Sequence, residues 1–124
     1  MDQNSIEKLD IFSQGMELAD KIWHIVHKWN YFSTKTLGYQ TVKAADAIAA
    51  NISEGYGRFL FKETRQYCYR ARGSLFETKT FVIKASNREL LSDKEFKMLL
   101  KNIEALLKKL NSYIKYIEIQ IANL

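Results

Sequence analysis

The sequence has no proline, a single cysteine and two histidines among its 124 residues. Because proline interrupts helix interiors and commonly marks loops in β-rich chains, its absence favours long helices. Cys68 alone cannot form an internal disulfide and has no partner at zinc-site spacing, which suits a reducing compartment. No run approaches the roughly 18 apolar residues that a membrane span needs. The N-terminal stretch MDQNSIEKLD lacks a secretory signal pattern, so we expect a cytoplasmic protein.

Hydrophobic residues make up 47% of the chain and charged residues 27%, a balance that can bury a core and argues against disorder. The length suits one compact domain over residues 1–124. Apolar residues recur at steps of three and four, which predicts helices near residues 5–30, 34–53, 60–86 and from 92 onward. Short connections between them predict an all-α fold, an antiparallel up-down-up-down four-helix bundle.

Local signals predict the helix ends and the buried faces. Thr34 to Gly38 offers N-caps for the second helix, and Gly55 and Gly57 end it through the left-handed conformation that glycine adopts. Ser92 to Glu95 is a capping box for the fourth helix. The expected core face of the first helix consists of Leu9, Phe12, Met16, Ala19, Trp23 and Val26. That of the third consists of Phe61, Thr64, Cys68, Ala71, Leu75, Thr78, Val82 and Ala85.

The net charge of +5 is unevenly spread along the chain. Residues 1–57 hold 5 basic and 7 acidic side chains, residues 58–88 hold 8 and 2, and residues 89–124 hold 6 and 5. Residues 58–88, here called the basic segment, therefore carry +6 and include all the arginines. Clustered arginine in a chain of pI about 9.3 is typical of nucleic-acid binding.

A stripe of cations follows the third helix. It consists of Arg58, Arg65, Arg72 and Lys79, which recur every seven residues. On a helix that spacing gives steps of about 10 Å, with Arg58 just ahead of the helix in the turn. Tyr69 and Phe76 fall between these cations, and Lys62 and Arg70 lie nearby. Guanidinium groups bind phosphate and stack on bases, and aromatic rings offer stacking platforms, so the stripe predicts a site for RNA or DNA.

Ion pairing is the alternative interpretation of the stripe. Glu54 is spaced to pair with Arg58, and Glu63 and Glu77 lie within the basic segment. Two acids cannot neutralise eight bases, so we favour an anionic partner.

The third and fourth helices carry more apolar side chains than a four-helix core needs. The surplus includes Tyr69, Phe76, Ile83, Leu100 and Leu107. These residues either form an interface with another copy of the chain or flank a thick core. They cannot be both a buried interface and free stacking platforms. If copies assemble through them, we expect the nucleic-acid contacts at Arg58, Lys62, Arg65 and Arg70.

Signals for catalysis are weak. His24 and His27 follow Glu17 and Asp20 at spacings that one helix face could bring together, but nothing completes a metal site, so a partly exposed histidine pair is expected. Cys68 falls on a core face, where a small hydrophobe is expected. No nucleophile, phosphate-binding or dinucleotide motif occurs. We therefore expect a protein that is not an enzyme, with no catalytic residue, metal or cofactor.

Residues 44–85 resemble the small bundle proteins encoded in intervening sequences of bacterial 23S ribosomal RNA genes. The pattern there is approximately RAAxSIPxNIAEGxGRxSxKExxxFxxxAxGSLxELxxxLxxA. This chain matches it at Ala44, Ala45, Ile48, Asn51, Ile52, Glu54, Gly55, Gly57, Arg58, Lys62, Glu63, Tyr67, Ala71, Gly73, Ser74, Leu75, Glu77 and Ala85. It departs from the pattern at Lys43, Ala49 and Leu60, where Arg, Pro and a capping Ser are usual.

The resemblance implies an antiparallel four-helix bundle that assembles as a ring-shaped homopentamer. It also implies a shared polar network of Asn51, Glu54, Ser74 and Glu77 between the second and third helices. A similar bundle and ring occur in the accessory variability determinant of diversity-generating retroelements, a basic protein that binds a reverse transcriptase and nucleic acid. We therefore expect an accessory protein that binds RNA or DNA, as an adaptor for a reverse transcriptase or for ribosomal RNA. The alternative is an interaction module whose basic surface binds an acidic protein.

Overall fold

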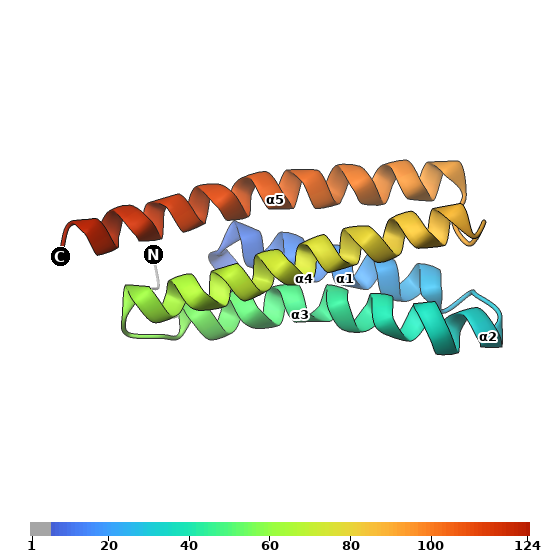
Figure 1. Ribbon diagram of the computed structural model, residues 1–124, viewed down its shortest axis with the longest axis horizontal. Coiled ribbons are helices and arrows are strands. Elements are labelled where there is room, and N and C mark those ends of the chain that lie inside the picture. The colour runs from blue at the N-terminus through green and yellow to red at the C-terminus, as the bar shows by residue number, and fades with distance from the viewer. Residues whose placement is uncertain (1–5) are drawn as a thin grey trace.

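The computed structural model of the protein describes residues 6–124. Its long helices alternate in direction (Figure 1), which confirms the predicted all-α antiparallel bundle. They are α1 (Asp10–Val26), α3 (Tyr39–Tyr56), α4 (Phe61–Asn87) and α5 (Asp93–Ala122). A 3-10 helix, η1 (Ile6–Lys8), precedes α1, and the short α2 (Tyr31–Ser33) leads towards α3. Residues 6–124 contain no strand, and none of their helices is long and apolar enough to cross a membrane.

The four long helices contact their neighbours around the bundle, α3 against α1 and α4, and α5 against α4 and α1. The contact between α3 and α4 is the most extensive, and that between α1 and α5 is the smallest of the four. The turn between α3 and α4 lies at the same end of the bundle as the C-terminus, opposite α2 (Figure 1). The basic segment begins in this turn and continues along α4.

The buried face of α4 agrees with the prediction. Its buried residues are Thr64, Cys68, Ala71, Leu75, Thr78, Val82 and Ala85. Phe61, which the pattern also placed there, is only half-buried. The buried hydroxyls of Thr64 and Thr78 donate to the carbonyls of Leu60 (3.3 Å) and Ser74 (2.8 Å), so both are satisfied within the helix.

The predicted core face of α1 is partly wrong. Met16 and Trp23 are 45% and 48% exposed, and the buried residues are Ile11, Gly15, Leu18, Ala19, Ile22 and Val26. Gly15 explains the rotation, because a Cβ there would lie only 3.3 Å from the Cβ of Ala49. α1 therefore approaches α3 closely at Gly15, and Leu18 and Ile22 are buried whereas Met16 and Trp23 are turned outward. Ser5, where the pattern placed the start of this helix, lies outside the described residues.

The entry into α3 also differs from the prediction. Helical structure begins at Tyr31, since the side chain of Asn30 accepts from the backbone N–H of Ser33 at 2.8 Å. It continues through a π-helical turn, Thr34–Gly38, into α3. A Cβ at Gly38 would lie 2.7 Å from Cγ1 of Val26, so this glycine permits close contact with α1. The interruption seen in the sequence is a widened helical turn and not a helix start.

Glycine near the end of α3 has a role other than the one predicted. Gly57 caps the helix with φ of −78°, so no left-handed conformation occurs there. Gly55 lies within α3, where a Cβ would lie 2.8 Å from Cβ of Tyr67. Gly55 thus permits close approach of α4. At the start of α5 the predicted capping box is confirmed, with Ser92 and Glu95 bonded reciprocally at 3.0 and 2.9 Å.

Candidate nucleic-acid interface

The predicted cation stripe lies along the junction of α4 with α5. Tyr69 donates its hydroxyl to Glu118 at 3.1 Å, and Arg72 donates to Oδ1 of Asn111 at 3.0 Å. These contacts hold the side chains between the two helices, so the stripe residues are half-buried. Lys62 and Arg70 are more exposed than the stripe itself.

The two ends of the stripe are neutralised by carboxylates. Nη2 of Arg58 lies 2.6 Å from Oε1 of Glu54, as the spacing predicted, and Nη1 lies 3.7 Å from Glu63. The hydrogen bond that Arg58 donates to Glu54 raises the pKa of Arg58 above its usual value. At the other end, Nζ of Lys79 lies 2.6 Å from Glu104 on α5. Ion pairing therefore accounts for both ends of the stripe.

The middle of the stripe has no carboxylate partner within the described residues. The guanidinium carbons of Arg65 and Arg72 lie 5.9 and 5.1 Å from the centre of the Tyr69 ring. The Nε atom of Arg65 is buried without a hydrogen-bond partner. Cation–π contact and packing thus hold these two positive charges in place without cancelling them.

A second aromatic ring holds cations closer to the turn. The guanidinium carbons of Arg58 and Arg70 each lie 4.8 Å from the centre of the Tyr67 ring. Arg58 also donates to the Tyr67 hydroxyl at 2.8 Å. Arg70 has no carboxylate partner in the described part of the chain, and neither does Lys62. Four cations are consequently available to an external anion: Lys62, Arg65, Arg70 and Arg72.

A family model described as 23S rRNA-intervening sequence protein matches residues 7–112, which include the whole basic segment. The chain belongs to this family. Membership confirms the resemblance carried by residues 44–85. A search of curated proteins gives no match.

In this member of the 23S rRNA-intervening sequence protein family, the surplus apolar residues differ in exposure. Phe76 and Ile83 on α4 are 49% and 39% exposed. Tyr69, Leu100 and Leu107 are half-buried, and Tyr69 and Leu107 pack against the core. Only part of the predicted surface is thus open to a second copy, and the oligomer interface stays a prediction.

The hydrogen bonds made by residues of the expected polar network join positions that are close in the sequence. Asn51 donates to the carbonyl of Ala47 at 2.8 Å, and Glu54 binds Arg58. The Ser74 carbonyl accepts from Thr78, and Glu77 is exposed. Within the described residues no hydrogen bond joins any two of these four, and Asn51 and Glu54 are instead bonded to residues four positions away.

The remaining candidates for catalysis or metal binding are Cys68, His24 and His27. Their surroundings are those of residues with a structural role. Cys68 is buried, and burial raises the pKa of its thiol to about 11, which disfavours the nucleophilic thiolate. His27 stacks on Trp23, with ring centres 5.0 Å apart, and His24 meets the same ring edge-on. No group of three potential metal ligands occurs among residues that the structure describes.

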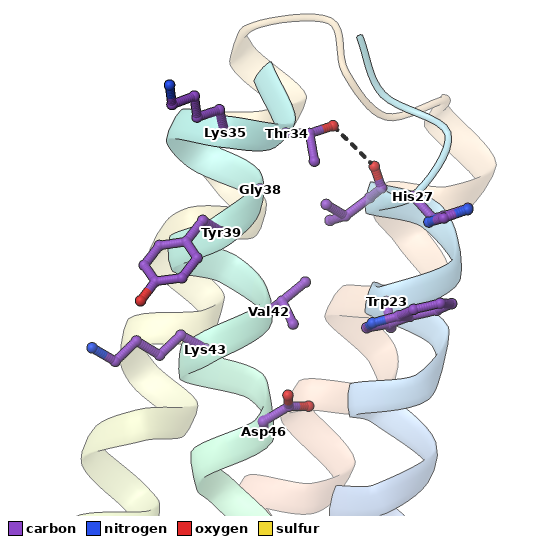
Figure 2. A pocket seen from close by; sticks show the side chains of 10 residues that line it. Trp23, His27, Thr34, Lys35, Gly38, Tyr39, Val42, Lys43 and Asp46 are labelled. Atoms are coloured by element: carbon purple, nitrogen blue, oxygen red, sulfur yellow. Dashed lines mark hydrogen bonds between the residues drawn. The ribbon is translucent and has the colours of Figure 1, made fainter. Parts of the chain in front are cut away.

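Sequence reasoning missed a pocket of about 620 Å³ between α1 and the α2–α3 segment. Figure 2 shows Val42 of α3 directed towards α1, with Trp23 and His27 on the α1 side. Burial, and then the charge of Asp20, raise the pKa of Asp46 at its lower edge. Trp23 is turned outward and lines this pocket. The sequence pattern placed Trp23 on the core face of α1, so the pocket was not predicted.

Proposed function

We propose that this chain is a non-enzymatic accessory protein that binds RNA or DNA through the exposed side of α4. The contact residues are Lys62, Arg65, Arg70 and Arg72, with Arg58 and Lys79 at the edges. The observation that carries the proposal is that these four cations of α4 have no carboxylate partner in the described chain. Neutralising phosphates releases counterions, which supplies most of the affinity of such a surface.

The side chains are arranged for phosphate contact. Guanidinium groups present a planar fork of donors that matches phosphate oxygens. Arg65 and Arg72 already lie over Tyr69, so less side-chain entropy is lost when a phosphate binds. Family membership suggests structured ribosomal RNA as the first ligand to test, with an adaptor role beside a reverse transcriptase as the second.

Assembly would multiply this surface. We propose a ring-shaped homopentamer in the cytoplasm, with Phe76 and Ile83 at the contacts between copies together with the less exposed Tyr69, Leu100 and Leu107. A ring would repeat Arg58, Lys62, Arg65 and Arg70, the contacts expected when copies assemble, around a common axis. Several weak contacts on one polymer then add up to a much higher affinity than one copy has.

Fluorescence anisotropy with a labelled RNA hairpin at low salt tests the proposal. Arg65→Glu combined with Arg70→Glu should weaken binding at least tenfold. The matched control is Lys94→Glu with Lys101→Glu, which makes the same change in net charge on exposed positions of α5. Equal losses in both double variants would contradict the assignment to α4. Absence of binding by the unaltered protein would favour the alternative, an acidic protein partner.

A further inference from the structure

The tyrosine rings of the basic segment are already covered. Tyr67 lies under Arg58 and Arg70, and Tyr69 lies under Arg65 and Arg72. A nucleic-acid base could stack on either ring only by displacing guanidinium groups from it. These rings therefore serve to position cations, and Tyr69 is not the open stacking platform that its place in the sequence suggested.

A different aromatic ring in the same segment is open. Phe59, in the turn between α3 and α4, is 97% exposed, and the adjoining Leu60 is 54% exposed. Burying a side chain as large as Phe is favourable, and within the described chain Phe59 gains almost none of this stabilisation. No cation lies over its ring in the described contacts. Phe59 and Leu60 are two consecutive exposed apolar residues, and apolar residues exposed together on a surface are more informative than a single one.

The position of the turn makes Phe59 accessible from several sides. The turn lies at one end of the bundle (Figure 1), so a side chain there is not flanked along its length by other helices. Phe76, by contrast, lies on the side of α4 and is 49% exposed. The cation nearest to it in the sequence, Lys79, is paired with Glu104. The Phe59 ring is therefore open to a stacking base over nearly all of its surface, and Phe76 over about half.

The charge around Phe59 identifies the kind of partner. Lys62 lies one turn further along α4, and Arg70 lies about 12 Å beyond Lys62 along the helix axis. The exposed rings of Tyr31 and Phe32 lie instead at the opposite end of the bundle, in the part of the chain that carries −2. Phe59 is thus the open aromatic side chain that adjoins the unpaired cations.

We propose that Phe59 is the base-stacking residue of the nucleic-acid surface. It stacks on an unpaired base, in a single-stranded segment or loop, while Lys62, Arg65 and Arg70 bind the neighbouring phosphates. This inference rests on the proposed function and narrows its ligand to nucleic acid with an unstacked base. An uninterrupted duplex would offer phosphates to the cations but no base to Phe59.

The test uses an RNA hairpin with a single-stranded tail that carries 2-aminopurine, whose fluorescence falls when it stacks. The full-length protein should quench the tail. Phe59→Ala should abolish the quenching and weaken tail binding about fivefold to a hundredfold, the range that one base–aromatic stack supplies. Phe32→Ala is the matched control and should retain both, because this 74% exposed ring lies at the opposite end of the bundle. Because Phe59 is exposed, its removal should leave the circular dichroism spectrum unchanged.

Three results would overturn the inference, and they are distinguishable. Tail binding and quenching by Phe59→Ala equal to those of the unaltered protein would overturn it alone. Unchanged quenching together with a smaller assembly mass for Phe59→Ala would assign Phe59 to a contact between copies. Absence of any RNA binding by the unaltered protein would overturn the proposed function as well.

Discussion

Gly55 is closely packed against α4, whereas Gly73 has open space beside it. A Cβ at Gly55 would lie 2.8 Å from Cβ of Tyr67 and 3.1 Å from the carbonyl of Thr64, whereas a Cβ at Gly73 would meet nothing within 4 Å. Gly55→Ala should therefore destabilise the protein by about 1–3 kcal/mol through overpacking between α3 and α4. Gly73→Ala should stabilise it by roughly 0.5–1 kcal/mol, because alanine is the better residue in a helix interior.

Urea unfolding of both glycine variants measures these free energies. The contradictory result is destabilisation by Gly73→Ala in the isolated protein, which would show that something approaches α4 closely at that position.

The buried thiol of Cys68 makes stability depend on alkaline pH. Burial raises its pKa from 9.0 to about 11, so between these values the unfolded chain has lost the proton that the folded chain keeps. Stability is thus fully present below pH 9 and falls as pH rises towards 11, by at most about 1.4 kcal/mol per pH unit. Tyr113, whose pKa burial raises from 10.0 to about 12, extends the loss to higher pH.

Urea unfolding from pH 8 to pH 11 checks this dependence. Cys68→Ala should have a lower stability at pH 8 but a shallower decline above pH 9, since the titrating group is gone. Parallel declines in the two proteins would show that the thiol does not contribute.

At the scale of a helix, α5 begins at a capping box. Ser92→Ala removes the acceptor for the backbone N–H of Glu95 and should cost about 1 kcal/mol of stability. Ser112→Ala is the matched control, because this exposed serine lies within α5 and only bonds back to the carbonyl of Lys108. Equal effects of the two substitutions on urea unfolding would contradict a special role for the cap.

The comparison of α4 with α1 shows why some elements could be predicted and others could not. Along α4, buried positions carry apolar or small residues at regular steps, so periodicity alone located them. Along α1, Trp23 and Met16 have the right spacing for a core but are exposed, because α1 approaches α3 through Gly15. Whether large or small residues face inward depends on the distance between helices, which one helix's pattern does not contain.

Part of the candidate site could also be predicted from the sequence, and part of it could not. The pairing of Arg58 with Glu54 followed from their spacing on the chain. The pairing of Lys79 with Glu104 joins two helices and depends on how α4 and α5 are aligned, so it could not be predicted. Exposure of Phe59 in the turn was also invisible in a sequence where its neighbours read as a helix start.

At the scale of the whole molecule, copies should assemble through the exposed apolar residues of α4. Phe76→Glu combined with Ile83→Glu would bury charges at the contact, so the homopentamer should dissociate to smaller species in sedimentation equilibrium. Met16→Glu, on the exposed side of α1, is the control and should leave the mass unchanged. A monomeric mass for the unaltered protein would contradict the assembly.

The central claim is that unpaired cations of α4 bind nucleic-acid phosphates. The most direct measurement is RNA affinity over a salt series, for the unaltered protein and for Arg65→Glu with Arg70→Glu. The unaltered protein should lose affinity steeply with salt, and the double variant should have a slope shallower by about 1–2, since each phosphate contributes about 0.7–0.9. Equal slopes for the two proteins would contradict the claim.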